Sequence, residues 1–199
     1  MKMKNKNIVK PSETEIARYV QMWYSEENKN YIEQESALKK LFLITYPNNI
    51  DLDDVLIKVC SLNDFYSTHI FSPFAVAKHI ISLDIDRKIK QGDLGIVNKI
   101  AMVKMNGVQK NFYSFATKYC SHHYPNLYPI YDSYVGKILL HFKKEDSFCE
   151  FGKIDLKEYT KFKNILLSFR TFYNLEIFTL KDIDRYLWLA GKEHFRKTY

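Results

Sequence analysis

The sequence contains little cysteine, glycine or proline, with 3 Cys, 6 Gly and 5 Pro among 199 residues. Cys60, Cys120 and Cys149 are too few and too scattered for a disulfide framework. The N-terminal lysines are not followed by the apolar stretch of a signal peptide, and no window is apolar enough to cross a bilayer. We therefore expect a reduced, cytoplasmic protein with no membrane segment.

The sequence is rich in positively charged and in aromatic residues. Lys and Arg outnumber Asp and Glu by 30 to 23, which gives a net charge of +7. Such a charge suits a polyanionic partner, but it is equally typical of proteins that need it only for solubility. The 15 Tyr and 14 Phe favour a well-packed core and leave rings that could stack on planar ligands.

Apolar residues recur at helical spacing in most segments between the few glycines and prolines, which predicts an all-α, multi-helix bundle. We expect residues 1–10 to form a flexible basic arm and residues 11–199 a single all-α domain, which could comprise two helical lobes sharing a cleft. We also expect a monomer. Helix starts are indicated at Ser12, Asp51 and Pro73, and a turn at Asn106–Gly107.

The segment from Ser114 to Val135 combines a lysine and an aspartate at the expected ends of neighbouring helices. Lys118 lies in a short helical segment, and a loop containing Pro129 leads to Asp132 at the start of the next helix. Asp132 followed by Ser133 is also typical of an ordinary helix N-cap, and the two roles are compatible. An amine nucleophile beside a carboxylate could act on a nucleic-acid sugar.

These residues carry a resemblance to a known family. FYSFATK followed by PIYDSYV resembles the helix-hairpin-helix DNA glycosylase superfamily, specifically its oxoguanine-glycosylase-like branch. In that alignment Ser114 to Lys118 occupy the hairpin that ends in Gly-Thr-Lys, with Ser114 and Ala116 at the glycine positions. Lys118 then falls on the Schiff-base lysine, and Asp132 falls near the catalytic aspartate, with one extra residue, Tyr131, between Ile130 and Asp132.

The resemblance implies further contacts with duplex DNA as the partner. Asn63, in the segment KVCSLNDFYSTHI, would fill the gap left by the extruded base. Trp188 and Phe195 on the last helix would form the base pocket. The remaining residues expected to bind nucleic acid are Lys110, Ser114 and Ala116, together with His122 and His123. The two histidines either face the phosphate backbone or hydrogen-bond locally.

The implied activity is that of a DNA N-glycosylase with lyase activity at abasic sites, without a cofactor. Lys118 would attack the sugar C1′ of a flipped nucleotide, and Asp132 would stabilise positive charge at the sugar or assist proton transfer. A Schiff base would remain after the base leaves, and elimination could then nick the strand.

Three other interpretations remain open from the sequence. Cys120, His122 and His123 include zinc-ligand types, but adjacent histidines point in different directions from a helix and no second ligand pair has the usual spacing, so we predict no metal. The chain could be a non-catalytic nucleic-acid-binding or interaction module of the same fold. It could also be an unrelated helical interaction protein in which the turn before Asp132 is purely structural.

Overall fold

The computed structural model describes residues 8–195, so part of the arm expected at residues 1–10 lies outside the described residues. Helices make up most of this range, which confirms the mainly helical prediction. The elements are α1 (Glu13–Trp23), α2 (Lys29–Lys40), α3 (Leu52–Tyr66), α4 (Pro73–Ser82), α5 (Asp86–Lys90), α6 (Gly95–Ala101), β1 (Met102–Met105), β2 (Val108–Asn111), α7 (Tyr113–His123), α8 (Ser133–Asp146), α9 (Tyr159–Phe172) and α10 (Leu180–Phe195).

Polar side chains begin several helices as the sequence predicts. Ser12 Oγ accepts a hydrogen bond from the backbone N–H of Glu15 at 3.2 Å. Asp51 caps α3, and Pro73 occupies the first turn of α4, where its missing N–H leaves no bond unmade. Asp132 caps α8. These local signals are strong because each one either satisfies or removes a backbone N–H that has no partner inside the helix.

A two-stranded hairpin departs from the all-α expectation. Strands β1 and β2 pair antiparallel, with Met102 opposite Asn111 and Met105 opposite Val108. Asn106 and Gly107 both have positive φ, at 50° and 79°, which is the conformation that tight hairpin turns require. The turn was therefore predicted correctly, but the strands beside it were not. Every residue of β2 is exposed, so the apolar alternation that marks a half-buried strand is absent.

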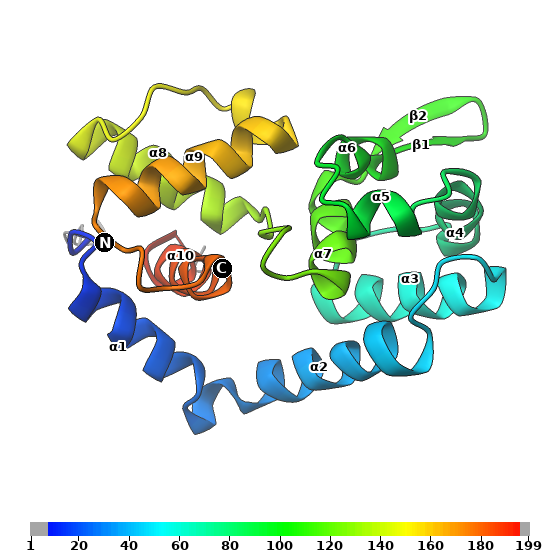
Figure 1. Ribbon diagram of the computed structural model, residues 1–199, viewed down its shortest axis with the longest axis horizontal. Helices are drawn as coiled ribbons and strands as arrows, with labels where there is room; N and C mark the ends of the chain where they lie inside the picture. Colours follow the sequence, from blue (N-terminus) through cyan, green and yellow to red (C-terminus); the bar gives the residue numbers. More distant parts are fainter. Residues whose placement is uncertain (1–7, 196–199) are drawn as a thin grey trace, which may run out of the picture.

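The helices fall into two groups that face each other (Figure 1). We call α1, α8, α9 and α10 the terminal lobe, and α2 to α7 with the hairpin the central lobe. The chain leaves the terminal lobe after α1 and returns through the loop between α7 and α8. One continuous cluster of buried apolar side chains runs through both lobes. A cavity at their junction is therefore bordered by segments that are far apart in the sequence.

Close packing of α10 on α8 fixes the terminal lobe. Gly191 lies so near Tyr134 that a Cβ at this position would be 2.7 Å from the Tyr134 carbonyl oxygen. Only glycine allows this approach without a shift of one helix. The contact holds α10 against the first turn of α8, which begins directly after Asp132.

Candidate functional site

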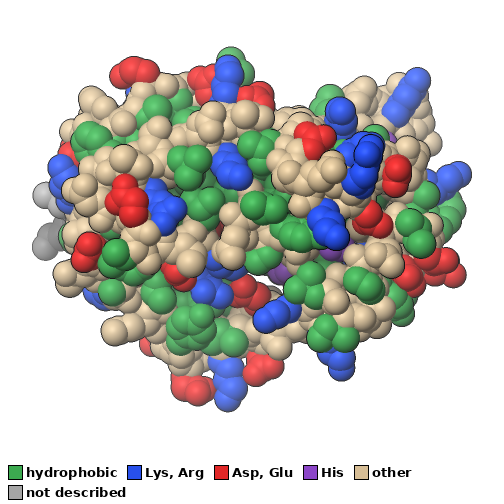
Figure 2. All heavy atoms as spheres, viewed as in Figure 1, with side chains coloured by type: hydrophobic (Ala, Val, Ile, Leu, Met, Phe, Trp, Pro, Cys, Tyr) green, Lys and Arg blue, Asp and Glu red, His purple; other side chains and the backbone are tan. Residues whose placement is uncertain are grey.

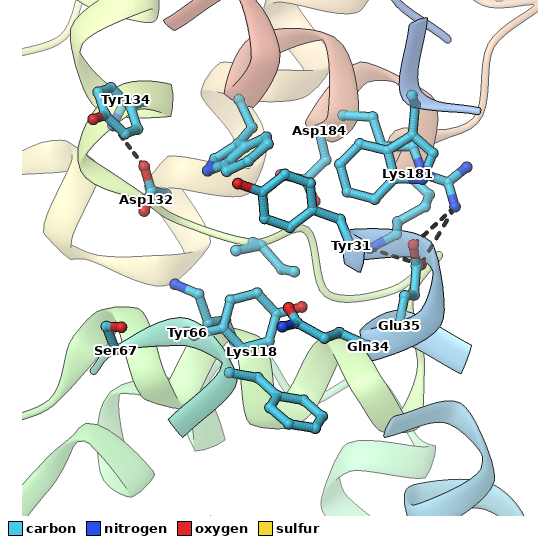
Figure 3. A pocket seen from close by; sticks show the side chains of 15 residues that line it. Tyr31, Gln34, Glu35, Tyr66, Ser67, Lys118, Asp132, Tyr134, Lys181 and Asp184 are labelled. Atoms are coloured by element: carbon cyan, nitrogen blue, oxygen red, sulfur yellow. Dashed lines mark hydrogen bonds and ion pairs between the residues drawn. The ribbon is translucent and has the colours of Figure 1, made fainter. Parts of the chain in front are cut away.

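A cavity of about 260 Å³ opens between the two lobes. Its lining includes side chains from α1, α2, α3, α7, α8 and α10 together with the loop before α8. Lys118, Asp132 and Asp184 all border it, and Figure 3 shows them around the same space. The structure thus brings together the lysine and the aspartate singled out in the sequence and adds a second carboxylate.

Lys118 is held inside α7 with its amine at the cavity. The side chain is only 3% exposed, and Nζ donates to Ser114 Oγ at 2.6 Å and to the Ser114 carbonyl oxygen at 3.4 Å. It also lies 5.1 Å from the centre of the Tyr66 ring. Burial lowers the pKa of Lys118, against the opposing effect of the Asp132 charge. The neutral amine, which is the nucleophilic form, is therefore more available than in an exposed lysine.

Asp132 reaches the cavity because the preceding loop is fastened to α7. Ser114 Oγ donates to the Tyr131 carbonyl oxygen at 3.1 Å, and the Tyr131 N–H donates to Thr117 Oγ1 at 3.1 Å. Asp132 Oδ1 then accepts from the Tyr134 N–H at 2.7 Å. Within residues 8–195 no ion pair of 4 Å or less joins Lys118 to Asp132. Both groups are thus positioned at one cavity without neutralising each other.

Asp184 is the functional candidate that the sequence reasoning missed. It projects from α10, is 6% exposed, and makes no side-chain hydrogen bond or ion pair with any described residue. Burial raises the pKa of Asp184 to about 7, against the opposing charges of Lys181 and Lys118. A signal for it existed, because it interrupts the apolar face of the helix formed by Leu180, Ile183 and Leu187.

Aromatic side chains form one wall of the cavity. The rings of Trp23 and Trp188 lie 6.0 Å apart edge to face, and Tyr31 lies 5.1 Å from Trp188. All three side chains border the cavity, and Trp188 is the one that the sequence analysis expected in a base pocket. Phe195 does not border it but packs against the apolar core, so its predicted role in a base pocket is wrong. It lies about two helical turns beyond Trp188 on α10.

Charged side chains form a second part of the cavity wall. Glu35 on α2 accepts from Arg185, with an N–O distance of 3.2 Å, and pairs with Lys181 at 3.3 Å. These pairs connect α2 of the central lobe to α10 of the terminal lobe. Arg185 also pairs with Asp182 at 3.6 Å, and among the described residues neither Lys181 nor Arg185 forms an ion pair with Asp184.

The predicted hairpin at Ser114–Lys118 is wrong. These residues form the first two turns of α7, which begins at Tyr113. Ala116 is fully buried, and the Ser114 hydroxyl is engaged with Lys118 and Tyr131. Ala116 also donates its N–H to the Phe112 carbonyl oxygen at 3.0 Å, so it cannot present its backbone to a DNA phosphate as a hairpin glycine would. The predicted contact of Ser114 stays a prediction. With no glycine in this stretch, the sequence favours an uninterrupted helix.

The two histidines are also not surface contacts. His122 Nε2 lies 3.0 Å from the Tyr66 hydroxyl, and His123 Nε2 lies 3.2 Å from Asn49 Nδ2. Both side chains are buried, and burial lowers the pKa of each to about 3, so they are uncharged at neutral pH. Their predicted contact with nucleic acid is wrong. Residues 8–195 contain no group of three or more His, Cys, Asp or Glu side chains that could hold a metal ion.

Asn63 and Lys110 have different outcomes. The Asn63 amide bonds to the N–H and carbonyl of Ile70 and to Thr68 Oγ1, so it closes the loop after α3 and does not border the cavity. The predicted contact of Asn63 with DNA is wrong because its amide is committed to this loop. Lys110 is exposed on β2, and its predicted contact stays a prediction.

Comparison with known proteins shows the family. A family model described as "N-terminal domain" (HI_0787_N) matches residues 15–127, a stretch that includes Lys118 and ends before Asp132. A protein of Haemophilus influenzae named "Uncharacterized protein" is 48% identical over 148 residues, which cover 74% of this chain and 71% of the relative. No solved structure matches. The fold is that of a mainly helical protein with a cavity between two lobes. The chain belongs to the HI_0787_N family.

No helix within residues 8–195 combines the length and the apolar character that a membrane span needs.

Proposed function

We propose that this protein is a DNA glycosylase-like enzyme that excises a modified base and uses Lys118 as its amine nucleophile. The observation that carries the proposal is the meeting of the buried Lys118 amine and the Asp132 carboxylate at one aromatic-walled cavity. An amine with a lowered pKa, a carboxylate and a stacking surface are the three components that this chemistry needs. The Lys118 and Asp132 positions of the glycosylase resemblance support the proposal, whereas its hairpin does not.

The cavity suits a ligand of nucleobase size. Pockets for drug-sized molecules span roughly 300–1,000 Å³, and this cavity of about 260 Å³ lies just below that range. The rings of Trp23, Tyr31 and Trp188 offer flat apolar surface, on which a base can stack without sequence-specific hydrogen bonds. An enzyme that acts on a base must take it out of the duplex, and a pocket between two lobes can receive it.

The residues at the cavity could divide the reaction between them. Ser114 holds the Lys118 amine at a fixed position on α7. The amine attacks C1′ of the extruded nucleotide as the bond to the base breaks. Asp132 stabilises the positive charge that develops on the sugar, because a carboxylate fixed as a helix N-cap keeps its position during the reaction. The Schiff base formed on Lys118 then permits elimination at the sugar.

Duplex DNA is the proposed partner, and its binding face is not marked by charge alone. Figure 2 shows Lys and Arg side chains interspersed with Asp and Glu on one face of the molecule. The net charge of +7 still favours a polyanion, and Lys104 and Lys110 on the hairpin are available to phosphate. Binding should therefore weaken as salt concentration rises.

Borohydride trapping on a duplex with one abasic site tests the proposal. The wild-type protein should give a covalent adduct, because reduction converts the Schiff base into a stable bond. Lys118→Gln should abolish the adduct, whereas Lys153→Gln should retain it, since Lys153 is exposed in the turn before Leu156. Thermal melting of both variants shows that they fold.

Failure of the trapping experiment has two informative forms. If no adduct forms but the protein binds duplexes in a salt-sensitive way, the chain is a non-catalytic nucleic-acid-binding module. If it neither traps nor binds at low salt, the nucleic-acid proposal is overturned. An adduct that persists in Lys118→Gln would overturn the assignment of the nucleophile.

A further inference from the structure

Asp184 carries a carboxyl group that is buried at the cavity and has no partner among residues 8–195. It shares its face of α10 with the apolar Leu187 and with the charged Lys181, and no described residue donates a hydrogen bond to it or pairs with it. A buried polar group without a partner is costly, so proteins retain one where a ligand or a reaction uses it. Lys118 and Asp132 already account for nucleophilic attack and charge stabilisation, which leaves Asp184 without a role.

Among the described residues, none of the charged groups around Asp184 forms an ion pair with it. Lys181 and Arg185 from α10 pair with Glu35 from α2, and the Lys118 amine on α7 donates to Ser114. Asp132, at the start of α8, adds a like charge, and Tyr66 from α3 is the neighbouring phenol. Burial therefore dominates, and the pKa of Asp184 rises to about 7. A large fraction of the protein molecules then carries a protonated, neutral Asp184 at neutral pH.

We propose that Asp184 is the general acid that protonates the departing base, an inference that rests on the proposed function. Two carboxyl groups at one site with different surroundings take different roles: one stays ionised beside the developing positive charge, while the other holds a proton for the leaving group. Asp132 is bonded to a backbone N–H at a helix start, whereas Asp184, at the same cavity, is buried on α10 and makes no side-chain hydrogen bond with a described residue. The positions of the two groups match this division.

The proposed step is balanced in atoms and charge. The Lys118 lone pair forms a bond to C1′, the glycosidic C1′–N bond breaks, and its electron pair goes to the base. The proton of the Asp184 carboxyl passes to the base at the same time, so that a neutral base departs and Asp184 becomes a carboxylate. That carboxylate can take up one proton from the ammonium group formed on Lys118, which restores its acid form.

The pH dependence of base release follows from the two pKa shifts. Asp184 acts in its protonated form, so release slows as pH rises above about 7. Lys118 acts in its neutral form, so release becomes faster as pH rises towards the lowered pKa of its amine. The reaction of an abasic site needs no protonated leaving base, and its rate should therefore lack the decline that Asp184 causes.

The test compares Asp184→Asn with wild type on two kinds of substrate. Single-turnover base release is measured from duplexes that each contain one oxidised, deaminated or alkylated base, and borohydride trapping is measured on an abasic duplex. Asp184→Asn should slow base release by about 100- to 10,000-fold, the usual contribution of a general acid. Trapping on the abasic duplex should persist. Glu176→Gln, at an exposed position before α10, is the matched control and should leave both reactions unchanged.

Each outcome separates this inference from the function on which it rests. Loss of base release with retained trapping, together with loss of the decline above pH 7, supports Asp184 as the acid. Base release by Asp184→Asn at the wild-type rate and pH profile overturns it. Wild-type trapping at abasic sites without release of any base in the panel also overturns it, while Lys118 keeps its proposed role. Absence of trapping in the wild type overturns the proposed function itself.

Discussion

Two buried lysines of the central lobe, Lys58 and Lys118, differ in what surrounds the amine. Lys58 on α3 is fully buried, and its Nζ donates to the carbonyl oxygens of Tyr46 and Asn48 at 3.1 and 2.8 Å and to Asn49 Oδ1 at 2.6 Å. Among the residues that the structure describes, Lys118 donates only to Ser114, and it borders a cavity. All three protons of the first amine are used within the fold, whereas the second amine retains capacity for a ligand.

Burial affects both amines in the same direction. It lowers the pKa of Lys58 to about 8 and also lowers that of Lys118. A shifted pKa therefore does not distinguish a structural lysine from a functional one. What distinguishes them is the number of acceptors already present and the empty space beside the nitrogen, and these two criteria can be tested separately.

The largest effect that we expect is the loss of stability in the Lys58→Met variant. This change leaves three buried oxygens without their donor, and we expect it to lower the free energy of unfolding by about 2–4 kcal/mol. Lys118→Met removes a buried charge together with bonds to one residue, and we expect a change within about 1 kcal/mol. Urea denaturation of both variants measures the difference. Equal losses would mean that Lys118 is also a structural lysine.

The two lysines also differ in how far the sequence alone predicts their surroundings. The register from Lys118 to Asp132 is local, because Ser114 and Thr117 fasten the loop to the helix that carries Lys118. The placement of these two residues on adjoining helices could therefore be predicted from the sequence, as could the helix caps at Ser12 and Asp51. Lys58 was not recognised as buried, because its acceptors lie in a loop before α3 that has no regular pattern.

Long-range pairing accounts for the errors at the two histidines. His122 and His123 look like surface residues in a basic segment, yet their partners Tyr66 and Asn49 come from distant parts of the chain. Asp184 was overlooked because its significance depends on the cavity, which forms only when α10 meets α2 and α7. The one local signal for Asp184 was a carboxylate that interrupts an apolar helix face, a pattern that indicates a buried functional group.

A second prediction concerns the stability cost of Asp184. Its folded pKa of about 7 lies above the ordinary value of 3.8 for an aspartate, so the folded protein binds more protons than the unfolded chain between these pH values. The contribution of Asp184 to stability is therefore full below about pH 4 and is lost as pH rises through about 7. Asp184→Asn should not show this loss, and at pH 8 it should be more stable than wild type by about 2–4 kcal/mol.

Urea denaturation between pH 4 and pH 8 measures this effect, with Glu176→Gln as the control. The two stability curves of wild type and Asp184→Asn should converge near pH 4 and separate as pH rises. A separation that stays constant with pH would show that the carboxyl is not neutral in the folded state. A more stable but inactive Asp184→Asn would follow the usual conflict between stability and activity at a functional site.

The smallest expected effect extends the comparison to an exposed lysine. Lys110 on β2 has no ion pair among the described residues and lies outside the cavity. If the hairpin contacts phosphate, Lys110→Gln should weaken duplex binding to a similar degree for all sequences and reduce the salt slope by about 1. Folding stability and abasic-site trapping at saturating protein should not change. Fluorescence anisotropy at several salt concentrations measures the slope, with Lys153→Gln as the exposed control. An unchanged slope would place the phosphate contacts elsewhere, because each lysine that neutralises a phosphate releases about one counterion.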